Sequence, residues 1–354
     1  MTVKTRYFVI VSLLVVGVGL GTGLMAYYVG FPTSAFLVTG GPEELRYLPS
    51  TSTVVAYADV REVMASELRQ RLRESVGTSA QENGQREFQE LTGINIETDI
   101  DRVVASLETS GSPTTNRMGT GVVLARGRFD EVKIEGLMRE HGAHVDIYKG
   151  KRLITAETPK PPTPPDSPSQ IPAVPPIPQT PPSFSLTFVE TGLVAVGTTA
   201  LVQHVVDLHT GGGASAATNE GLMERVKAVG TGNNVWAVGR FDVLRAQANL
   251  PEAVAERLPP ITWFAVSGRI NGGIEALLSA EARDEVSANN LRDVVRGFLA
   301  LAKLQTSAKP EYQRFVDSLQ LSGTGKTVAL SVDVPAQVFD ALRAAMPKPQ
   351  PKRE

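Results

Sequence analysis

The chain has 354 residues, of which 42% are hydrophobic and 20% are charged, and it carries a formal net charge of −2 with no cysteine. That length suffices for one large domain or two ordinary ones. The balanced charge, with no basic cluster before the tail, excludes a dedicated nucleic-acid surface. The absence of cysteine excludes disulfides, thiolate metal ligands and catalytic thiols.

An uncharged apolar run extends from Tyr7 to Val29. At about 1.5 Å per residue, a helix of this length covers the roughly 30 Å core of a bilayer. Lys4 and Arg6 precede the run and residues 30–42 carry no charge, so we expect residues 1–6 in the cytoplasm. The rest of the chain would then lie in the periplasm or outside the cell, on a single-pass bacterial inner-membrane anchor.

A cleaved signal peptide is the alternative reading of the same run. Its apolar core is usually about 7–15 residues long and ends at a small-x-small site. Here the run is longer and leaves through bulky residues, MAYYVGF at 25–31, which favours an uncleaved anchor.

Four alternate glycines lie inside the run, at Gly17, Gly19, Gly21 and Gly23. They form two overlapping small-xxx-small pairs, a spacing that lets membrane helices approach closely. The pattern indicates contact with another helix, in a homodimer or with a protein partner. The alternative is that glycine is simply common in membrane helices, and these four line two faces rather than one.

A strand, cap and helix unit follows the irregular neck at 30–44 and then recurs. Its first copy is a β-rich run at Val54–Ala58, the cap Asp59, and apolar residues at helical spacing from Val60 to Leu72. GVVLARGRFDEVKIEGLM at 121–138 and NVWAVGRFDVLRA at 234–246 share Ala-x-Gly-Arg-Phe-Asp, and VALSVDVPAQVFDAL at 328–342 is a looser copy.

The shared residues predict local structure. Glycine lets the backbone bend out of a strand, and aspartate caps a helix N-terminus. The strand exits and helix caps assigned in this way are Asp59, Gly127, Asp130, Gly239, Asp242 and Asp333. A ligand-binding role for the twin Arg-Phe-Asp is the alternative reading.

Turn signals between these units predict hairpins. The paired strands are expected at 103–108 with 121–127, 145–148 with 152–156, 184–189 with 193–197, and 261–270 with 274–282. Helices are expected at 201–208, 222–229, 288–305 and 311–319.

Hairpin-paired strands with helices between them indicate an α+β fold with largely antiparallel sheets. We expect one extracytoplasmic domain over 45–346, with a duplication that divides it into halves at 45–210 and 218–346. The proline-rich stretch 159–182 reads as an extended insertion in a surface loop, and 347–354 as a short disordered tail.

Three apparent chemical motifs fail on inspection. GTGKT at 323–327 lacks the earlier glycine of a phosphate loop and leads into a strand, so it reads as a hairpin turn. His141, His144 and Asp146 are separated by a helix end and lack a third ligand at zinc spacing. Asp99 and Asp101 read as a turn or cap rather than as glycosidase carboxylates. We therefore assign no catalytic, cofactor-binding or metal-binding residue.

The chain resembles a bacterial family of single-anchor extracytoplasmic proteins known only as a domain of unknown function. The residues that carry the resemblance are LP at 48–49, VVAYADV at 54–60, LTGIN at 91–95, DIDRV at 99–103 and the Gly-Arg-Phe-Asp exits. The resemblance covers most of the ectodomain and implies its architecture, without an active site, substrate or cofactor.

Three functional hypotheses remain open. The first is a membrane-tethered, non-enzymatic scaffold or interaction module that contacts the bilayer through the anchor and a protein partner or second copy outside it. The second is binding of a lipid or other envelope-derived ligand between sheet and helices. The third is a hydrolase with a dispersed active site.

Overall fold

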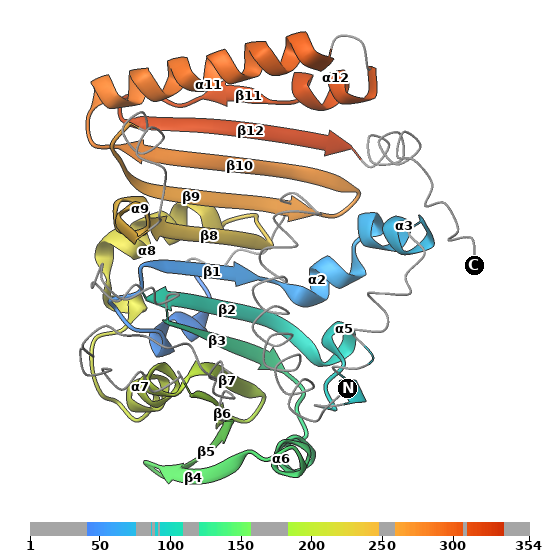
Figure 1. The fold of residues 1–354 in the computed structure, drawn as a ribbon, viewed down its shortest axis with the longest axis vertical. Helices are drawn as coiled ribbons and strands as arrows, with labels where there is room; N and C mark the ends of the chain where they lie inside the picture. The colour runs from blue at the N-terminus through green and yellow to red at the C-terminus, as the bar shows by residue number, and fades with distance from the viewer. Residues whose placement is uncertain are drawn as a thin grey trace, which may run out of the picture.

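One antiparallel sheet organises the protein (Figure 1). The computed structural model describes residues 41–75, 86, 89–90, 93–108, 120–156, 183–247, 259–306 and 310–335. In these ranges twelve strands follow the order β11-β12-β10-β9-β8-β1-β2-β3-β7-β6-β5-β4. The expected α+β fold with antiparallel strands is confirmed.

The strands have the following bounds: β1 Val54–Ala58, β2 Ile100–Glu108, β3 Thr120–Gly127, β4 His144–Tyr148, β5 Lys151–Ala156, β6 Phe184–Glu190, β7 Leu193–Thr198, β8 Val235–Arg240, β9 Ile261–Ile270, β10 Gly273–Ala282, β11 Gln320–Ser322 and β12 Thr327–Pro335. The described helices are η2 Glu43–Tyr47, α2 Val60–Ala65, α3 Glu67–Ser75, α5 Ile96–Asp99, α6 Glu131–Glu140, α7 Thr199–His209, η3 Ala216–Thr218, α8 Glu220–Gly230, α9 Phe241–Gln247, α11 Glu285–Thr306 and α12 Pro310–Asp317.

The four expected hairpins all form, as β2–β3, β4–β5, β6–β7 and β9–β10. Lys149 and Gly150, between β4 and β5, both have positive φ, as a two-residue hairpin turn requires. The stretch 323–326 connects β11 to β12, as expected of a turn.

The helix expected from Val60 to Leu72 is instead two helices that meet at Ser66. This residue has extended backbone angles, and its hydroxyl donates to the Val63 carbonyl at 2.7 Å. The same hydroxyl accepts from the Arg69 N–H at 3.3 Å. Ser66 therefore ends α2 and begins α3, because its side chain competes with the helical hydrogen bonds.

The largest core lies between one face of the sheet and η2, α7 and α8. It contains Trp236, Leu45, Leu48, Leu124, Leu193 and Leu222 among its most deeply buried side chains. Smaller cores lie under α6, under α2 and α3, and under α11. The strand register places α11 and α8 on opposite faces of the sheet. Val328, in the core under α11, is in register with Gly239 of β8 through Ala280 and Phe264, so these residues share one face. Val238, the next residue of β8, points to the other face and belongs to the core under α8.

The aspartates of the repeated unit occupy different positions. Asp59 and Asp130 are the N-cap residues of α2 and α6 and accept from the N–H groups of Glu62 and Lys133. Asp242 is not an N-cap, because α9 begins at Phe241; its carboxylate pairs with Arg240 and the Val243 N–H. Asp333 is not a cap either, because β12 continues through it to Pro335 while alternate valines stay on one face.

Replacing Asp130 by alanine should cost about 1 kcal/mol of unfolding free energy, since the Lys133 N–H would lose its acceptor. Asp333→Ala is the matched control, because that residue caps no described helix and should change stability by less than about 0.5 kcal/mol. Urea unfolding of both variants would measure the difference. Equal losses would contradict the capping role.

The anchor at 7–29, with its four glycines, and the proline-rich stretch 159–182 lie outside the described residues. So does the helix expected after Asp333. Among the residues that the structure describes, no helix is both long and apolar enough to cross a membrane.

Candidate functional site: a buried ion-pair cluster

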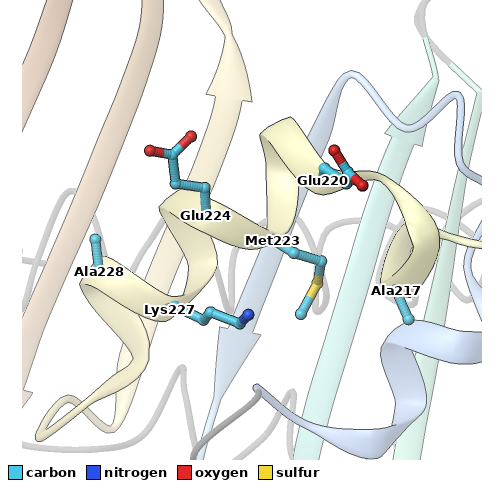
Figure 2. Close-up of a pocket in the computed structure, with 6 residues that line it drawn as sticks. All are labelled: Ala217, Glu220, Met223, Glu224, Lys227 and Ala228. Carbon is cyan, nitrogen blue, oxygen red and sulfur yellow. The ribbon is translucent and has the colours of Figure 1, made fainter.

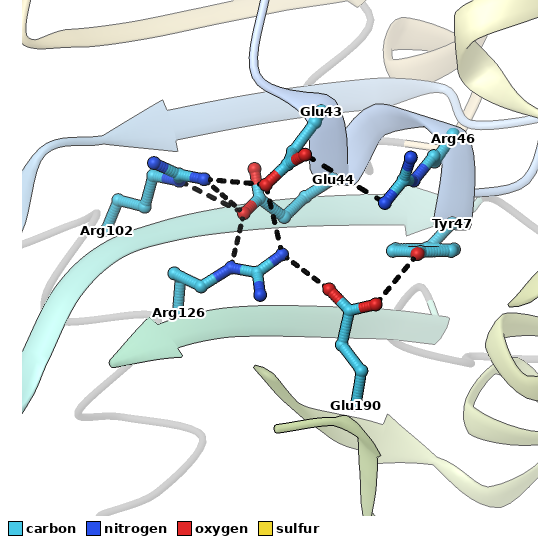
Figure 3. A network of polar contacts seen from close by, with 7 residues as sticks. All are labelled: Glu43, Glu44, Arg46, Tyr47, Arg102, Arg126 and Glu190. Atoms are coloured by element: carbon cyan, nitrogen blue, oxygen red, sulfur yellow. Dashed lines mark hydrogen bonds and ion pairs between the residues drawn. The ribbon is translucent and has the colours of Figure 1, made fainter. Parts of the chain in front are cut away.

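Seven polar residues meet where η2 crosses the sheet, and we name them the η2 cluster (Figure 3). Its members are Glu43, Glu44, Arg46 and Tyr47 of η2, Arg102 of β2, Arg126 of β3 and Glu190 of β6. Leu45, Tyr47 and Leu48 are buried in the main core, which holds η2 against the sheet. The cluster therefore involves the first helix that the structure describes.

Glu44 is the centre of the cluster and is fully buried. Its Oε1 accepts from Arg102 Nε and from Arg126 Nε, each at 3.0 Å. Its Oε2 is also buried and has no hydrogen-bond partner in the structure. A buried carboxylate is tolerated only when cations compensate its desolvation, and here two guanidinium groups do so.

Glu190 extends the cluster toward β6. It accepts from Arg126 at 2.8 Å and from the Tyr47 hydroxyl at 3.2 Å. The Tyr47 ring in turn lies 5.4 Å from the ring of His209 on α7. The network thus joins η2 to three strands and one helix.

Burial and neighbouring charges shift the pKa values of three members of the cluster. Burial alone would raise the pKa of Glu190, but the hydrogen bond and charge of Arg126 outweigh it and hold that pKa below its usual value. Burial would lower the pKa of Arg126, but its bonds to Glu44 and Glu190 raise it. Burial and the Glu190 charge raise the pKa of Tyr47, so its hydroxyl stays protonated.

The chemistry of the cluster is structural. Three carboxylates face three guanidinium groups, and Glu44 and Glu190 are held in ion pairs. A general base needs a carboxylate that can accept a substrate proton, whereas the Arg126 guanidinium lowers the pKa of Glu190 and so makes that carboxylate less basic. The cluster holds η2 against the sheet through β2, β3 and β6.

The lowered pKa of Glu190 predicts a pH dependence of stability. The contribution of its ion pair should be complete above the unfolded-state value of about 4.3 and should be lost as pH falls through the lower folded-state pKa. Urea midpoints measured between about pH 5 and about pH 3 should fall more steeply for the wild type than for Glu190→Gln. Parallel slopes would contradict the role of this carboxylate.

Two hollows lie on the surface of the described residues. One, of about 630 Å³, lies on α8 and is lined by Glu220, Met223, Glu224 and Lys227. Figure 2 shows the two carboxylates and the ammonium group extending away from one another. The other lies beside the β9–β10 turn and the end of β12. The lining residues of neither hollow combine a nucleophile with a base.

Of the residues named for metal or acid chemistry, His144 and Asp146 lie together, with His144 Nε2 3.5 Å from an Asp146 carboxylate oxygen, and the others have separate partners. His141 ends α6 and its Nδ1 contacts the Leu137 carbonyl at 2.6 Å, while His144 lies in β4. Asp99 accepts from the Asn95 N–H, and Asp101 pairs with Arg61. Among the described residues no group of three metal-ligating side chains occurs.

These features define an α+β protein built on one large antiparallel sheet, with a buried ion-pair cluster that joins η2 to that sheet. No family model and no curated protein matches the chain. Two solved structures of TP0453 are similar to it in fold. Crystal form III has 8% identity and a TM-score of 0.45, covering 85% of this chain and 97% of that one. Crystal form I has 7% identity and a TM-score of 0.41, covering 86% and 97%. The family resemblance drawn from the sequence stays a prediction.

Proposed function

We propose that the protein is a membrane-tethered, non-enzymatic module of the bacterial envelope that acts through contacts made by its folded domain. The observation that supports this most strongly is the η2 cluster. A buried charge network fixes the first described segment to the sheet, twelve residues after the end of the expected anchor. Such an arrangement suits a domain that must be held firmly on its tether.

The tether itself remains part of the proposal. It rests on the uncharged run Tyr7–Val29, with Lys4 and Arg6 on its cytoplasmic side. The glycines at positions 17, 19, 21 and 23 would supply a contact with a second copy or a partner helix.

Crosslinking in native membranes followed by purification in mild detergent tests the proposal. We expect the full chain in the membrane fraction, together with a stable partner or a second copy. A chain that is released by alkaline carbonate would contradict the anchor, and a clean monomer without crosslinked species would contradict the interaction role.

The remaining two hypotheses have less support. A lipid held between sheet and helices needs interior space, whereas the core beneath α7 and α8 is filled by fully buried side chains such as Val202, Val205 and Val226. A hydrolase needs converging acid, base or nucleophilic groups, and neither surface hollow brings such groups together.

We also infer an internal duplication from the arrangement of the central strands. β1 and β8 pair antiparallel about Ala56 and Ala237. Each is followed by a helix. After β1 the chain adds β2 and then β3 on one side of the sheet, and after β8 it adds β9 and then β10 on the other side. A two-fold relation between halves beginning near β1 and β8 would produce this order.

A further inference from the structure

The outer side of α11 carries an unusual concentration of exposed apolar residues. We define this outer face as Val286, Val294, Phe298, Leu301 and Leu304 of α11 with Phe315 of α12. These are six of the eleven exposed large apolar side chains among the described residues, while the other five are spread over β2, α6, β4 and β10. Phe298 is 68% exposed and Leu304 is 72% exposed.

The helix is attached to the sheet by a different stripe. Ala288 and Leu291 pack on Ala282, Val328 and Leu321, and the guanidinium of Arg292 donates to the carbonyls of Gly325 and Thr327 at 2.8 and 2.9 Å. At 100° per residue the outer face begins beside this stripe and turns away from the sheet. In Figure 1, α11 runs along the end of the sheet beside β11 and β12.

The polar side of the helix lies on the other flank. Arg296 and Lys303, seven positions apart, share that flank and are more than half exposed. They pair with Asp293 at 2.8 Å and with Asp317 at 3.3 Å. The 22-residue helix α11 thus has a broad apolar side and a charged side. Its charged residues exclude a position across the membrane, whereas an amphipathic helix of this kind can lie along the membrane surface.

We propose that the outer face of α11 lies on the surface of the bilayer that holds the anchor, with the helix parallel to the membrane plane. This inference rests on the proposed function, since it assigns the anchored membrane as the partner. Apolar side chains of an amphipathic helix enter the boundary between headgroups and acyl chains, while flanking Arg and Lys side chains extend toward the phosphates.

The neck is long enough for this contact. From Val29 to Gly41 an extended chain spans about 40 Å at roughly 3.3 Å per residue. Gly41 lies against Leu45 and Val226 of α8, which packs under β8 and β9. From there to the end of the sheet is about four strand spacings, or roughly 20 Å, plus the thickness of the sheet. A tether of this length keeps α11 close to the membrane surface, at an effective concentration on the order of millimolar. A contact between α11 and the membrane that would be weak for a free domain is therefore favoured.

The absence of cysteine allows a direct test in the full chain. Phe298→Cys, carrying an environment-sensitive fluorophore, would be reconstituted in phosphatidylglycerol and phosphatidylethanolamine vesicles that contain spin-labelled lipid. Val132→Cys on α6, also strongly exposed, is the matched control, and Tyr28→Cys reports on the anchor. We expect a blue shift and several-fold stronger lipid quenching at position 298 than at position 132, with quenching also at position 28.

The failures of this inference and of the tether are distinguishable. Quenching at position 28 without quenching at position 298 would overturn the membrane contact of α11 and leave the tether intact. Loss of quenching at both positions would overturn the tether and the contact that depends on it. A blue shift at position 298 that depends on protein density and not on quencher would identify a second copy as the partner and overturn the lipid assignment. Leu301→Glu should abolish the signal at position 298, and Val132→Glu should leave it unchanged.

Discussion

Replacing Arg126 by methionine should lower the free energy of unfolding by about 3 kcal/mol, because its ion pair with Glu44 is largely buried. Arg126 donates to Glu44, Glu43 and Glu190, so its loss leaves the buried Glu44 with Arg102 as its remaining cation. The cost comes from keeping the Glu44 charge out of water with one of its two compensating cations removed. Urea denaturation would measure it.

Removing the whole charge set is the informative control. The triple variant Glu44→Leu, Arg102→Met, Arg126→Met should recover most of the lost stability, because no buried charge is then left unpaired. If the triple variant were less stable than Arg126→Met, the cluster would owe its effect to packing or hydrogen bonding rather than to charge compensation. Arg61→Met, at an exposed ion pair, should change stability by less than about 1 kcal/mol.

Replacing Gly127 by alanine should cost about 3 kcal/mol, at the upper end for overpacking. A Cβ at this position would lie 1.9 Å from the Asp99 carbonyl oxygen and 3.0 Å from Ile100 Cα. These are backbone atoms, so no rotamer change relieves the clash, and the β2–β3 pair must open where α5 leads into β2.

Gly136→Ala provides the contrast within the same segment. Gly136 lies inside α6, and an added Cβ would meet no atom within 4 Å, so alanine should stabilise the helix by about 0.5–1 kcal/mol. Thermal unfolding of both variants separates the two roles of glycine. A stabilising effect of Gly127→Ala would show that the β2–β3 pair can shift without cost.

Local signals in the sequence account for most of the elements. Turn residues such as Lys149-Gly150 predict hairpins because the backbone angles they favour join two adjacent strands. Strand order depends on contacts between distant segments, so the pairing of β1 with β8 and of β3 with β7 has no local signal. The cap assignment of Asp242 is wrong because the short pattern found before α6 recurs there with the strand running on to Arg240 and the helix beginning directly at Phe241. The cap assignment of Asp333 is wrong because β12 continues through that residue to Pro335.

The η2 cluster escapes prediction because its members come from four separate segments. One signal is present in the alternation of the two strands. Arg102 shares a face of β2 with the buried residues Val104 and Ser106, and Arg126 shares a face of β3 with the buried residues Leu124 and Val122. A charged residue on the buried face of a strand requires a partner. The acidic pair Glu43-Glu44, at the end of the expected irregular neck, supplies it.

The central position of β1 has a consequence for the order of folding. β1 pairs with β2 on one side, but its other neighbour, β8, lies about 180 residues further along the chain. During synthesis from the N-terminus, the first seven strands are complete while the free edge of β1 awaits its partner. Contacts so distant in sequence form slowly, and an unpaired strand edge attracts other chains. The protein is therefore most exposed to aggregation before β8 arrives, and a chaperone that shields this edge would act at that stage.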